Sequence, residues 1–388
     1  MNRSIVYIAI VIIIAVIAII IGYYIGTTQR GATTTISTST VLEPYITVTD
    51  FANRTIKIPR NISRIVAIGP GALRLVVYLN ATDMVVGVEE IEKTWDPVGR
   101  DYAMAVYNRF KDLPTIGPGG PGRTPDPERI LAVKPDLVVM SLYYAQLYDP
   151  DKLQQEVGAP VVVVDYTPAT SPDLSAFYRA LRLLGTVLNR SERAEELINY
   201  VENILNDLRQ RVKGVDTSMV RVYVGAVSYR GAQPFTATQS PYPPLWWLST
   251  KSIVDNATST RGFINIDFEY LISMQPDIVF IDENNLNVVL QDFNRSSDKY
   301  CSLKAFRDGK VYGLLPYNYY HTNLAVALAD AYYIGKVLYP DRFTDIDPIE
   351  KANEIFMKFL DEPLYQKYID GGYLGFTNLS DLFGCVGE

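Results

Sequence analysis

Two glycine-rich segments have the composition best suited to holding a ligand. Gly69-Pro70-Gly71 lies between an apolar run and an apolar helical segment, and four of the seven residues from Gly117 to Arg123 are glycine. Glycine lets a ligand approach the backbone closely, and free N–H groups at a helix start attract anions. A tight strand-to-helix turn requires the same glycines, so the pattern leaves both interpretations open.

Tyrosines and one histidine extend this set. The chain has 28 tyrosines; phenols can stack on a flat chelate, hydrogen-bond an oxyanion or bind ferric iron, although most tyrosines are expected to be packing residues. His321 lies at an expected strand-to-helix turn, where it could contact a ligand, cap a helix or face solvent. The candidate ligand-binding residues are Gly69, Pro70, Gly71, Arg74, Gly119, Gly120, Arg123, Tyr143, Tyr144, Tyr229, Arg230, Gln233, Tyr317, Tyr320 and His321.

Alternating strands and helices must position these residues. A hairpin is expected over residues 46–58, a buried strand over 64–68 and a helix over 72–79, and the same alternation restarts after Gly214. This order is typical of an α/β fold with mostly parallel sheets covered on both faces. Ligands of such folds bind at the carboxyl ends of the strands, which is where the candidate residues lie.

An internal sequence repeat indicates two lobes. Residues 126–139 (DPERILAVKPDLVV) return 141 positions later as residues 267–280 (DFEYLISMQPDIVF), each copy a short helix followed by an apolar strand. The segment from 171 to 213 is expected to be helical with a break near 189–191. The expected divisions are an N-terminal anchor (1–26), a Thr/Ser-rich stalk (27–44), an N-terminal lobe (45–170), a helical linker (171–214) and a C-terminal lobe (215–388).

The arrangement resembles the substrate-binding proteins of ABC importers for ferric siderophores, haem, cobalamin and, in some members, molybdate or tungstate. The resemblance covers about residues 45–370 and is carried by residues 50–59 (DFANRTIKIP), residues 64–67 (RIVA), the two copies of the repeat and the long helix. It implies two Rossmann-like lobes joined by a long α-helix, with the ligand in the cleft between them and no enzymatic activity. A tethered anchor with a stalk is similar to the archaeal arrangement.

The resemblance also implies a permease with its ATPase subunits as partner. Family members offer one acidic residue per lobe to permease arginines, and the matching positions are Glu128 and Glu269. Charge-assisted contacts to arginine suit such a role. Each glutamate could instead be a first-turn residue favoured by the helix dipole.

The N-terminal segment and the sequons indicate an extracellular body. Residues 5–25 carry no charge and are long enough to span a bilayer, which favours an uncleaved anchor over a cleaved secretory signal. Cys301 and Cys385 could form a disulfide or remain free buried thiols. The candidate glycosylation sites are Asn53, Asn61, Asn80, Asn189, Asn256, Asn294 and Asn378.

The composition and the absence of catalytic and metal-binding motifs narrow the possible classes of function. A net charge of −7 argues against a nucleic-acid partner. A chelatase-like enzyme and a surface adhesion protein are the different-class alternatives, but no catalytic motif, metal site or cofactor is expected. We expect a monomer whose ligand is a ferric iron complex. Molybdate or tungstate remains an alternative because the glycine loops favour a small anion, and cobalamin because the family carries it.

Overall fold

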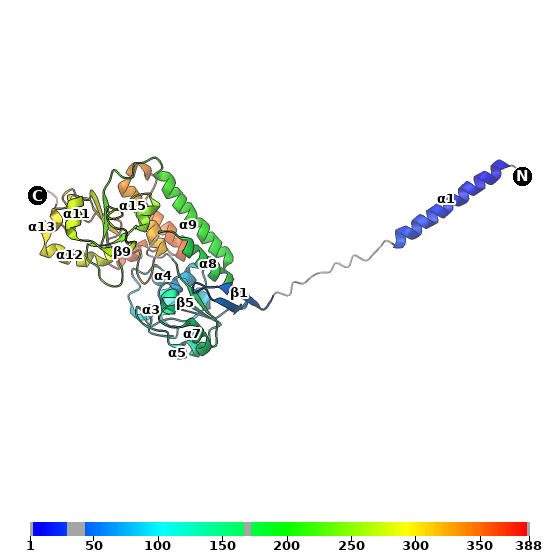
Figure 1. Cartoon of the computed structure of the whole chain (residues 1–388), viewed down its shortest axis with the longest axis horizontal. Coiled ribbons are helices and arrows are strands. Elements are labelled where there is room, and N and C mark those ends of the chain that lie inside the picture. Colours follow the sequence, from blue (N-terminus) through cyan, green and yellow to red (C-terminus); the bar gives the residue numbers. More distant parts are fainter. Residues whose placement is uncertain (1–2, 29–42, 167–171, 386–388) are drawn as a thin grey trace. The chain divides into compact units, whose positions relative to one another are not determined.

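The structure, a computed structural model, describes residues 3–28, 43–166 and 172–385, and most of the expected stalk lies outside these ranges. Two units are distinguished, an N-terminal one and a body that begins at Pro44 (Figure 1). The N-terminal unit contains helix α1 (Arg3–Thr28). Its segment Ile5–Gly26 has a mean hydropathy of 3.4. At about 1.5 Å per residue, this segment is long enough to cross a membrane.

Two parallel sheets form the framework of the body. The strand order is β4-β3-β5-β6 in the first lobe and β11-β10-β7 in the second, and all neighbouring strands within them are parallel. The strands are β3 (Ile65–Ile68), β4 (Val85–Gly87), β5 (Leu137–Ser141), β6 (Val161–Val164), β7 (Val222–Gly225), β10 (Ile278–Asp282) and β11 (Val311–Leu314). The expected α/β fold with two lobes is confirmed.

Two smaller antiparallel pairs accompany these sheets. Strands β1 (Tyr45–Thr49) and β2 (Thr55–Pro59) form the hairpin expected from the alternation of residues 46–58. Strands β8 (Ala237–Ser240) and β9 (Gly262–Asn265) form a pair that the sequence did not indicate. Strand β8 reads Ala-Thr-Gln-Ser and is fully buried, so it lacks the alternation of apolar and polar residues from which a strand is predicted.

Helices cover both faces of each sheet. The α-helices of the body are α2 (Ala72–Tyr78), α3 (Ile91–Thr94), α4 (Asp101–Phe110), α5 (Pro127–Ala132), α6 (Leu142–Ala145), α7 (Pro150–Val157), α8 (Ser175–Val187), α9 (Ser191–Arg211), α10 (Pro243–Trp247), α11 (Phe268–Met274), α12 (Leu286–Arg295), α13 (Ser297–Cys301), α14 (Lys304–Arg307), α15 (Leu324–Leu338), α16 (Pro348–Leu360) and α17 (Tyr365–Asp370). Short 3-10 helices occupy Thr82–Met84, Glu283–Asn285, Pro340–Arg342 and Ser380–Leu382.

Alternate strand residues enter different cores. In β3, Ile65 packs into the core that contains α2 and α8, whereas Val66 packs into a second core with Ile130 of α5 and Leu153 of α7. Successive side chains of a strand point to opposite faces, and here both faces are buried. This burial explains why these strands are continuous apolar runs.

The two lobes share one large hydrophobic core. This core contains strand residues of both sheets together with buried residues of α8, α9, α15 and α16. Helix α16 follows the second lobe in sequence but packs against α2 and α4 of the first. A wide hinge motion would expose part of this common core to water, so the packing opposes it.

The long helical segment has the expected break. It divides into α8 and α9 on either side of residues 188–190. Near its start, α9 contacts the first lobe, because Arg193 Nε donates to the Tyr78 carbonyl at 3.1 Å. Near its end, Arg211 donates to both carboxylate oxygens of Asp345 at 2.7 and 2.8 Å. Helix α9 therefore connects distant parts of the body (Figure 1).

In each copy of the internal repeat, an aspartate forms a hydrogen bond to the residue that precedes a neighbouring strand. Asp136 Oδ2 accepts the backbone N–H of Arg64 at 2.9 Å, directly before β3. Asp277 Oδ2 accepts the backbone N–H of Arg221 at 3.0 Å, directly before β7. The Arg221 side chain also lowers the pKa of Asp277 below its ordinary value by hydrogen bonding. The same aspartate therefore has the same structural role in both lobes.

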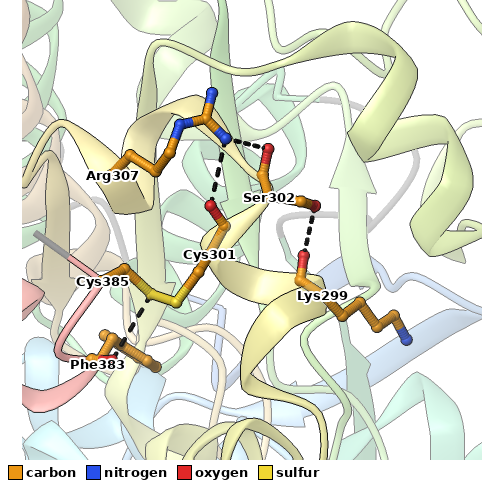
Figure 2. The surroundings of a disulfide bond; sticks show 6 residues. All are labelled: Lys299, Cys301, Ser302, Arg307, Phe383 and Cys385. Carbon is orange, nitrogen blue, oxygen red and sulfur yellow. Dashed lines mark hydrogen bonds between the residues drawn. A yellow bond between two sulfur atoms is a disulfide. The ribbon is translucent and has the colours of Figure 1, made fainter. Parts of the chain in front are cut away.

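A disulfide closes the C-terminal end of the second lobe. Cys301 of α13 is bonded to Cys385 (Figure 2), which is the pairing considered from the sequence. Phe383 packs nearby in a core that includes Tyr300 and Phe306. The carbonyl of Cys301 also accepts a hydrogen bond from Arg307 at 3.2 Å. The disulfide and this core together hold the chain end against α13 and α14.

Candidate functional site

A cavity of about 810 Å³ lies at the carboxyl ends of both parallel sheets. From the first lobe, Pro70 follows β3 and Asp165 follows β6. From the second lobe, Ser228 lies after β7, Asn284 after β10 and Asn318 after β11. The cavity therefore lies between the lobes at the edge where α/β folds bind ligands.

Aromatic rings form much of the cavity wall. Tyr229 stacks on Phe263 with ring centroids 4.2 Å apart and an interplanar angle of 9°. Trp95 from the first lobe faces Tyr319 from the second, with centroids 6.3 Å apart and an angle of 29°. Such surfaces suit a ligand with a flat or apolar face.

An amide-rich wall is contributed by the second lobe. Asn284 Nδ2 donates to Ser228 Oγ at 3.1 Å, and Asn285 Nδ2 donates to the carbonyl of Ala226 at 2.8 Å. Asn318 Nδ2 donates to the carbonyl of Ser228 at 2.6 Å. These bonds fix the orientation of the amides before any ligand arrives, which lowers the entropic cost of binding.

His321 joins the two lobes at the cavity wall. Its Nε2 lies 3.3 Å from Asp165 Oδ1, and its Nδ1 accepts the backbone N–H of Thr322 at 2.9 Å. Its ring also lies 4.2 Å from the ring of Tyr166, centroid to centroid. Tyr320 and His321 both have positive φ angles, of 51° and 80°. Such backbone strain in non-glycine residues is common at ligand sites.

Fewer than half of the candidate ligand-binding residues line this cavity. Those that do are Pro70, Tyr143, Tyr229, Arg230, Tyr317, Tyr320 and His321. Those that do not are Gly69, Gly71, Arg74, Gly119, Gly120, Arg123, Tyr144 and Gln233. A larger share of the second-lobe candidates than of the first-lobe candidates therefore lines the cavity.

Three N–H groups of the glycine segments donate hydrogen bonds within the protein. Gly69 N donates to Glu89 Oε2 at 3.0 Å, and Gly120 N donates to the phenol of Tyr320 at 3.1 Å. Gly122 N donates to the Tyr143 phenol, also at 3.1 Å. Side chains therefore already occupy three of the N–H groups on which the expected anion cradle would depend. At Gly69, φ is +80° and a Cβ would lie 2.2 Å from Ser141 Oγ, so the turn itself requires glycine.

Arg74 requires a correction, because it is not accessible to a ligand. Its guanidinium is wholly buried and donates to Asp101 Oδ1 at 2.8 Å and to the Tyr166 phenol at 2.9 Å. It also donates to the carbonyls of Tyr319 and Tyr320 in the other lobe, at 2.9 and 3.2 Å. Arg74 therefore fixes the segment that carries His321 from behind the cavity wall.

Glu89 lies behind the same wall and is neutral over much of the pH range. Its Oε2 accepts from Gly69 N and from the Tyr320 phenol, the latter at 3.1 Å. Burial raises the pKa of Glu89 from 4.5 to about 8, although these hydrogen bonds oppose the shift. A protonated Glu89 thus connects the β3–α2 turn of the first lobe to Tyr320 of the second.

Some of the cavity residues that were not predicted had a usable signal in the sequence. Asn284 and Asn285 directly follow β10 at its carboxyl end, so the rule that selected the other loops also applies to them. Trp95 follows the four-residue helix α3, and Phe263 lies on the unexpected strand β9. Nothing in the local sequence distinguishes these two aromatic residues from core residues.

The other candidate sites lie on the outer surface. Glu128 on α5 and Glu269 on α11 are exposed, one on each lobe. All seven sequon asparagines are also exposed. Within residues 3–28, 43–166 and 172–385, no cluster of three or more His, Cys, Asp or Glu side chains is placed to hold a metal ion.

Comparison with known sequences gives a family and two relatives. The family described as periplasmic binding protein matches residues 65–317. The molybdate-binding protein MolA of Haemophilus influenzae is 24% identical over 333 residues, covering 80% of this chain and 90% of MolA. An ABC transporter substrate-binding lipoprotein of Bacillus subtilis, YvrC, is 20% identical over 282 residues, covering 70% of this chain and 78% of YvrC.

Comparison with solved structures supports the same fold. Molybdate-bound MolA has a TM-score of 0.63 at 21% identity, covering 81% of this chain and 98% of MolA. The petrobactin-binding protein YclQ of Bacillus subtilis has a TM-score of 0.56 at 17% identity, covering 78% of this chain and 99% of YclQ. Both have a fold similar to that of the body described above.

Proposed function

Since this chain belongs to the periplasmic binding protein family, we propose that it captures a ferric iron complex outside the cell and delivers it to a permease. At the family level, the chain is a substrate-binding protein of an ABC importer, and such proteins work with permease and ATPase subunits. Its relatives are solute-binding proteins and not enzymes. The proposal adds the cargo, the membrane anchor and the docking residues.

The size of the cavity is the observation that carries the cargo proposal. A tetrahedral oxyanion of five heavy atoms fills at most roughly 150 Å³, if each water-sized group takes about 30 Å³. The cavity of about 810 Å³ is several times larger and lies in the range of about 300–1,000 Å³ that accommodates larger organic ligands. An organic chelate of iron fits this volume, whereas a bare oxyanion would leave most of it filled with water.

The side chains of the cavity favour an anionic chelate with a flat face. Tyr229 and Phe263 offer a stacked aromatic surface. Arg230 is the single Arg or Lys side chain among the described residues that line the cavity. Its guanidinium carbon lies 5.0 Å from the ring centroid of Tyr229. A charged, planar donor beside an aromatic surface suits the oxygen atoms of a negatively charged chelate.

Molybdate is the second candidate, because the relative MolA is described as a molybdate-binding protein. A small oxyanion needs several converging N–H donors. Here Gly69, Gly120 and Gly122 already donate to other protein groups. Tungstate would bind by the same chemistry, and cobalamin is a third candidate of chelate size. The ferric complex therefore remains our first choice.

Three features support an anchored, extracellular body. Helix α1 contains a 22-residue apolar segment long enough to span a membrane. The disulfide between Cys301 and Cys385 is typical of oxidising compartments. The seven sequon asparagines are exposed, as glycosylation would require. We propose a single-pass anchor that holds the body at the outer face of the membrane.

Glu128 and Glu269 are the proposed docking residues for the permease. They occupy equivalent positions on α5 and α11 of the two lobes. Among the described residues, neither glutamate makes an ion pair or a side-chain hydrogen bond, and both are exposed. Their carboxylates are thus available to arginines of a partner through charge-assisted contacts.

Ligand-induced thermal stabilisation tests the cargo proposal. The purified full chain in detergent would be heated with ferric chelates, haem, cobalamin, molybdate or tungstate, and its melting temperature recorded with and without each compound. Binding to the native state alone stabilises a protein by about 2.7 kcal/mol at a hundredfold excess over Kd. A ferric chelate should raise the melting temperature and be recovered unchanged. A rise with molybdate only would replace the first candidate with the second, and no rise with any compound would refute both.

A further inference from the structure

Each proposed docking glutamate has an exposed aliphatic residue one helical turn further along. Leu131 on α5 is 49% exposed and follows Glu128 by three positions. Ile272 on α11 is 38% exposed and follows Glu269 by three positions. Residues three apart lie on the same face of a helix. Each lobe therefore presents one carboxylate and one aliphatic side chain together.

The local backbone holds the two pairs in equivalent settings. Helix α5 is followed by Lys134 with φ of 47°, and α11 by Gln275 with φ of 45°. Two residues after each of these positions, the aspartate of the repeat binds the start of a neighbouring strand. The acidic and aliphatic pair is therefore part of the duplicated framework, unlike an isolated exposed apolar residue, which is ordinary on protein surfaces.

The charge of the two pairs decides which partner fits. If two copies of this chain met through these surfaces, both copies would bring the same glutamates to the contact, and like charges across an interface oppose association. A partner with two-fold symmetry can offer the same basic and apolar contact once to each lobe. A membrane permease built from two equivalent halves has this symmetry.

We propose that Leu131 and Ile272 are anchor residues of the permease-docking surface, each entering an apolar pocket beside the arginine that binds Glu128 or Glu269. This inference rests on the proposed docking role of the two glutamates and adds a hydrophobic component to it. The carboxylates steer and orient the encounter, whereas burial of the aliphatic side chains slows dissociation. Helices α5 and α11 lie on different lobes (Figure 1), so the proposal requires a permease that contacts both lobes at once.

The test uses a double variant and a matched control. Leu131→Gln with Ile272→Gln removes both aliphatic side chains. The control, Leu147→Gln with Ile349→Gln, also changes one leucine and one isoleucine, each 44% exposed but outside the two helices. The full-length chain in detergent would be titrated against its purified permease–ATPase complex, and each variant would also be titrated with the ferric chelate that stabilises the wild type.

The Leu131/Ile272 double variant should bind the permease at least about tenfold more weakly than the control, mainly through faster dissociation, and bind the chelate as the wild type does. Equal permease affinities of the two double variants would overturn the inference. Glu128→Arg with Glu269→Arg separates this failure from that of the proposed function. If only the charge variant loses affinity, docking stands without its apolar component; if it also binds like the wild type, the docking assignment itself is wrong.

Discussion

Replacing Glu89 by glutamine should make the protein more resistant to alkaline pH. Burial raises the pKa of Glu89 from 4.5 to about 8, so the folded state binds its proton more tightly than the unfolded state does. The stability that this carboxyl contributes is present in full below about pH 4.5 and is lost as the pH rises toward 8. At about 1.4 kcal/mol per pH unit, the loss above pH 8 is at most about 5 kcal/mol.

Glutamine has nearly the same shape as the protonated carboxyl but does not titrate. Its oxygen can accept the hydrogen bonds of Gly69 N and the Tyr320 phenol that Glu89 accepts. Relative to the wild type, the variant should therefore gain up to about 4 kcal/mol in free energy of unfolding between pH 5 and pH 9. Glu90→Gln, at the neighbouring exposed position, is the control and should gain nothing.

Urea unfolding of the full-length chain in detergent, followed by near-ultraviolet circular dichroism, measures this difference at several pH values. Burial also raises the pKa of Glu283 to about 8, so the wild type and the variant should both lose some stability at alkaline pH. The difference between the wild type and the variant isolates the contribution of Glu89 to the pH dependence of the free energy of unfolding. If their difference in free energy changed by less than about 1 kcal/mol from pH 5 to pH 9, the account of a neutral buried Glu89 would be refuted.

Three further outcomes are expected. Replacing Cys301 and Cys385 by serine opens a link that spans 84 residues and should lower the free energy of urea unfolding by about 4 kcal/mol; an unchanged midpoint would contradict this. Arg74→Lys should cost about 3–5 kcal/mol, because a lysine ammonium cannot replace all the buried hydrogen bonds that the guanidinium makes to Asp101, the Tyr166 phenol and the carbonyls of the other lobe; a wild-type melting temperature would argue against this role. Tyr229→Ala should weaken chelate binding about tenfold in fluorescence titrations while changing stability by less than about 1 kcal/mol, and unchanged affinity would remove Tyr229 from the ligand contacts.

The framework of the fold could be predicted because its signals are local. The two copies of the repeat, residues 126–139 and 267–280, indicated a helix and a strand in each lobe, and both lobes have them. The break in the long helix near residue 189 was also confirmed. Apolar runs and caps report short-range structure, so these elements follow from neighbouring residues alone.

The cavity was harder to predict because its wall depends on contacts between distant residues. Arg74 was a candidate ligand-binding residue after a glycine turn, but it binds carbonyls about 245 residues away in the other lobe. Gly120 looked like an anion cradle, but the phenol of Tyr320 occupies its N–H group. Neither contact can be predicted from the neighbouring residues in the sequence. The rule that places ligands at strand ends located the cavity correctly, but could not decide which side chains at those ends are free.

Isothermal titration of the full-length chain with a ferric chelate and with molybdate tests the central claim most directly. The cavity of about 810 Å³, with its aromatic and amide walls, predicts saturable one-to-one binding of a ferric chelate with a Kd below about 1 µM, equivalent to about −8 kcal/mol. Molybdate should bind far more weakly or not at all. Tight binding of molybdate without binding of any ferric chelate would contradict the account.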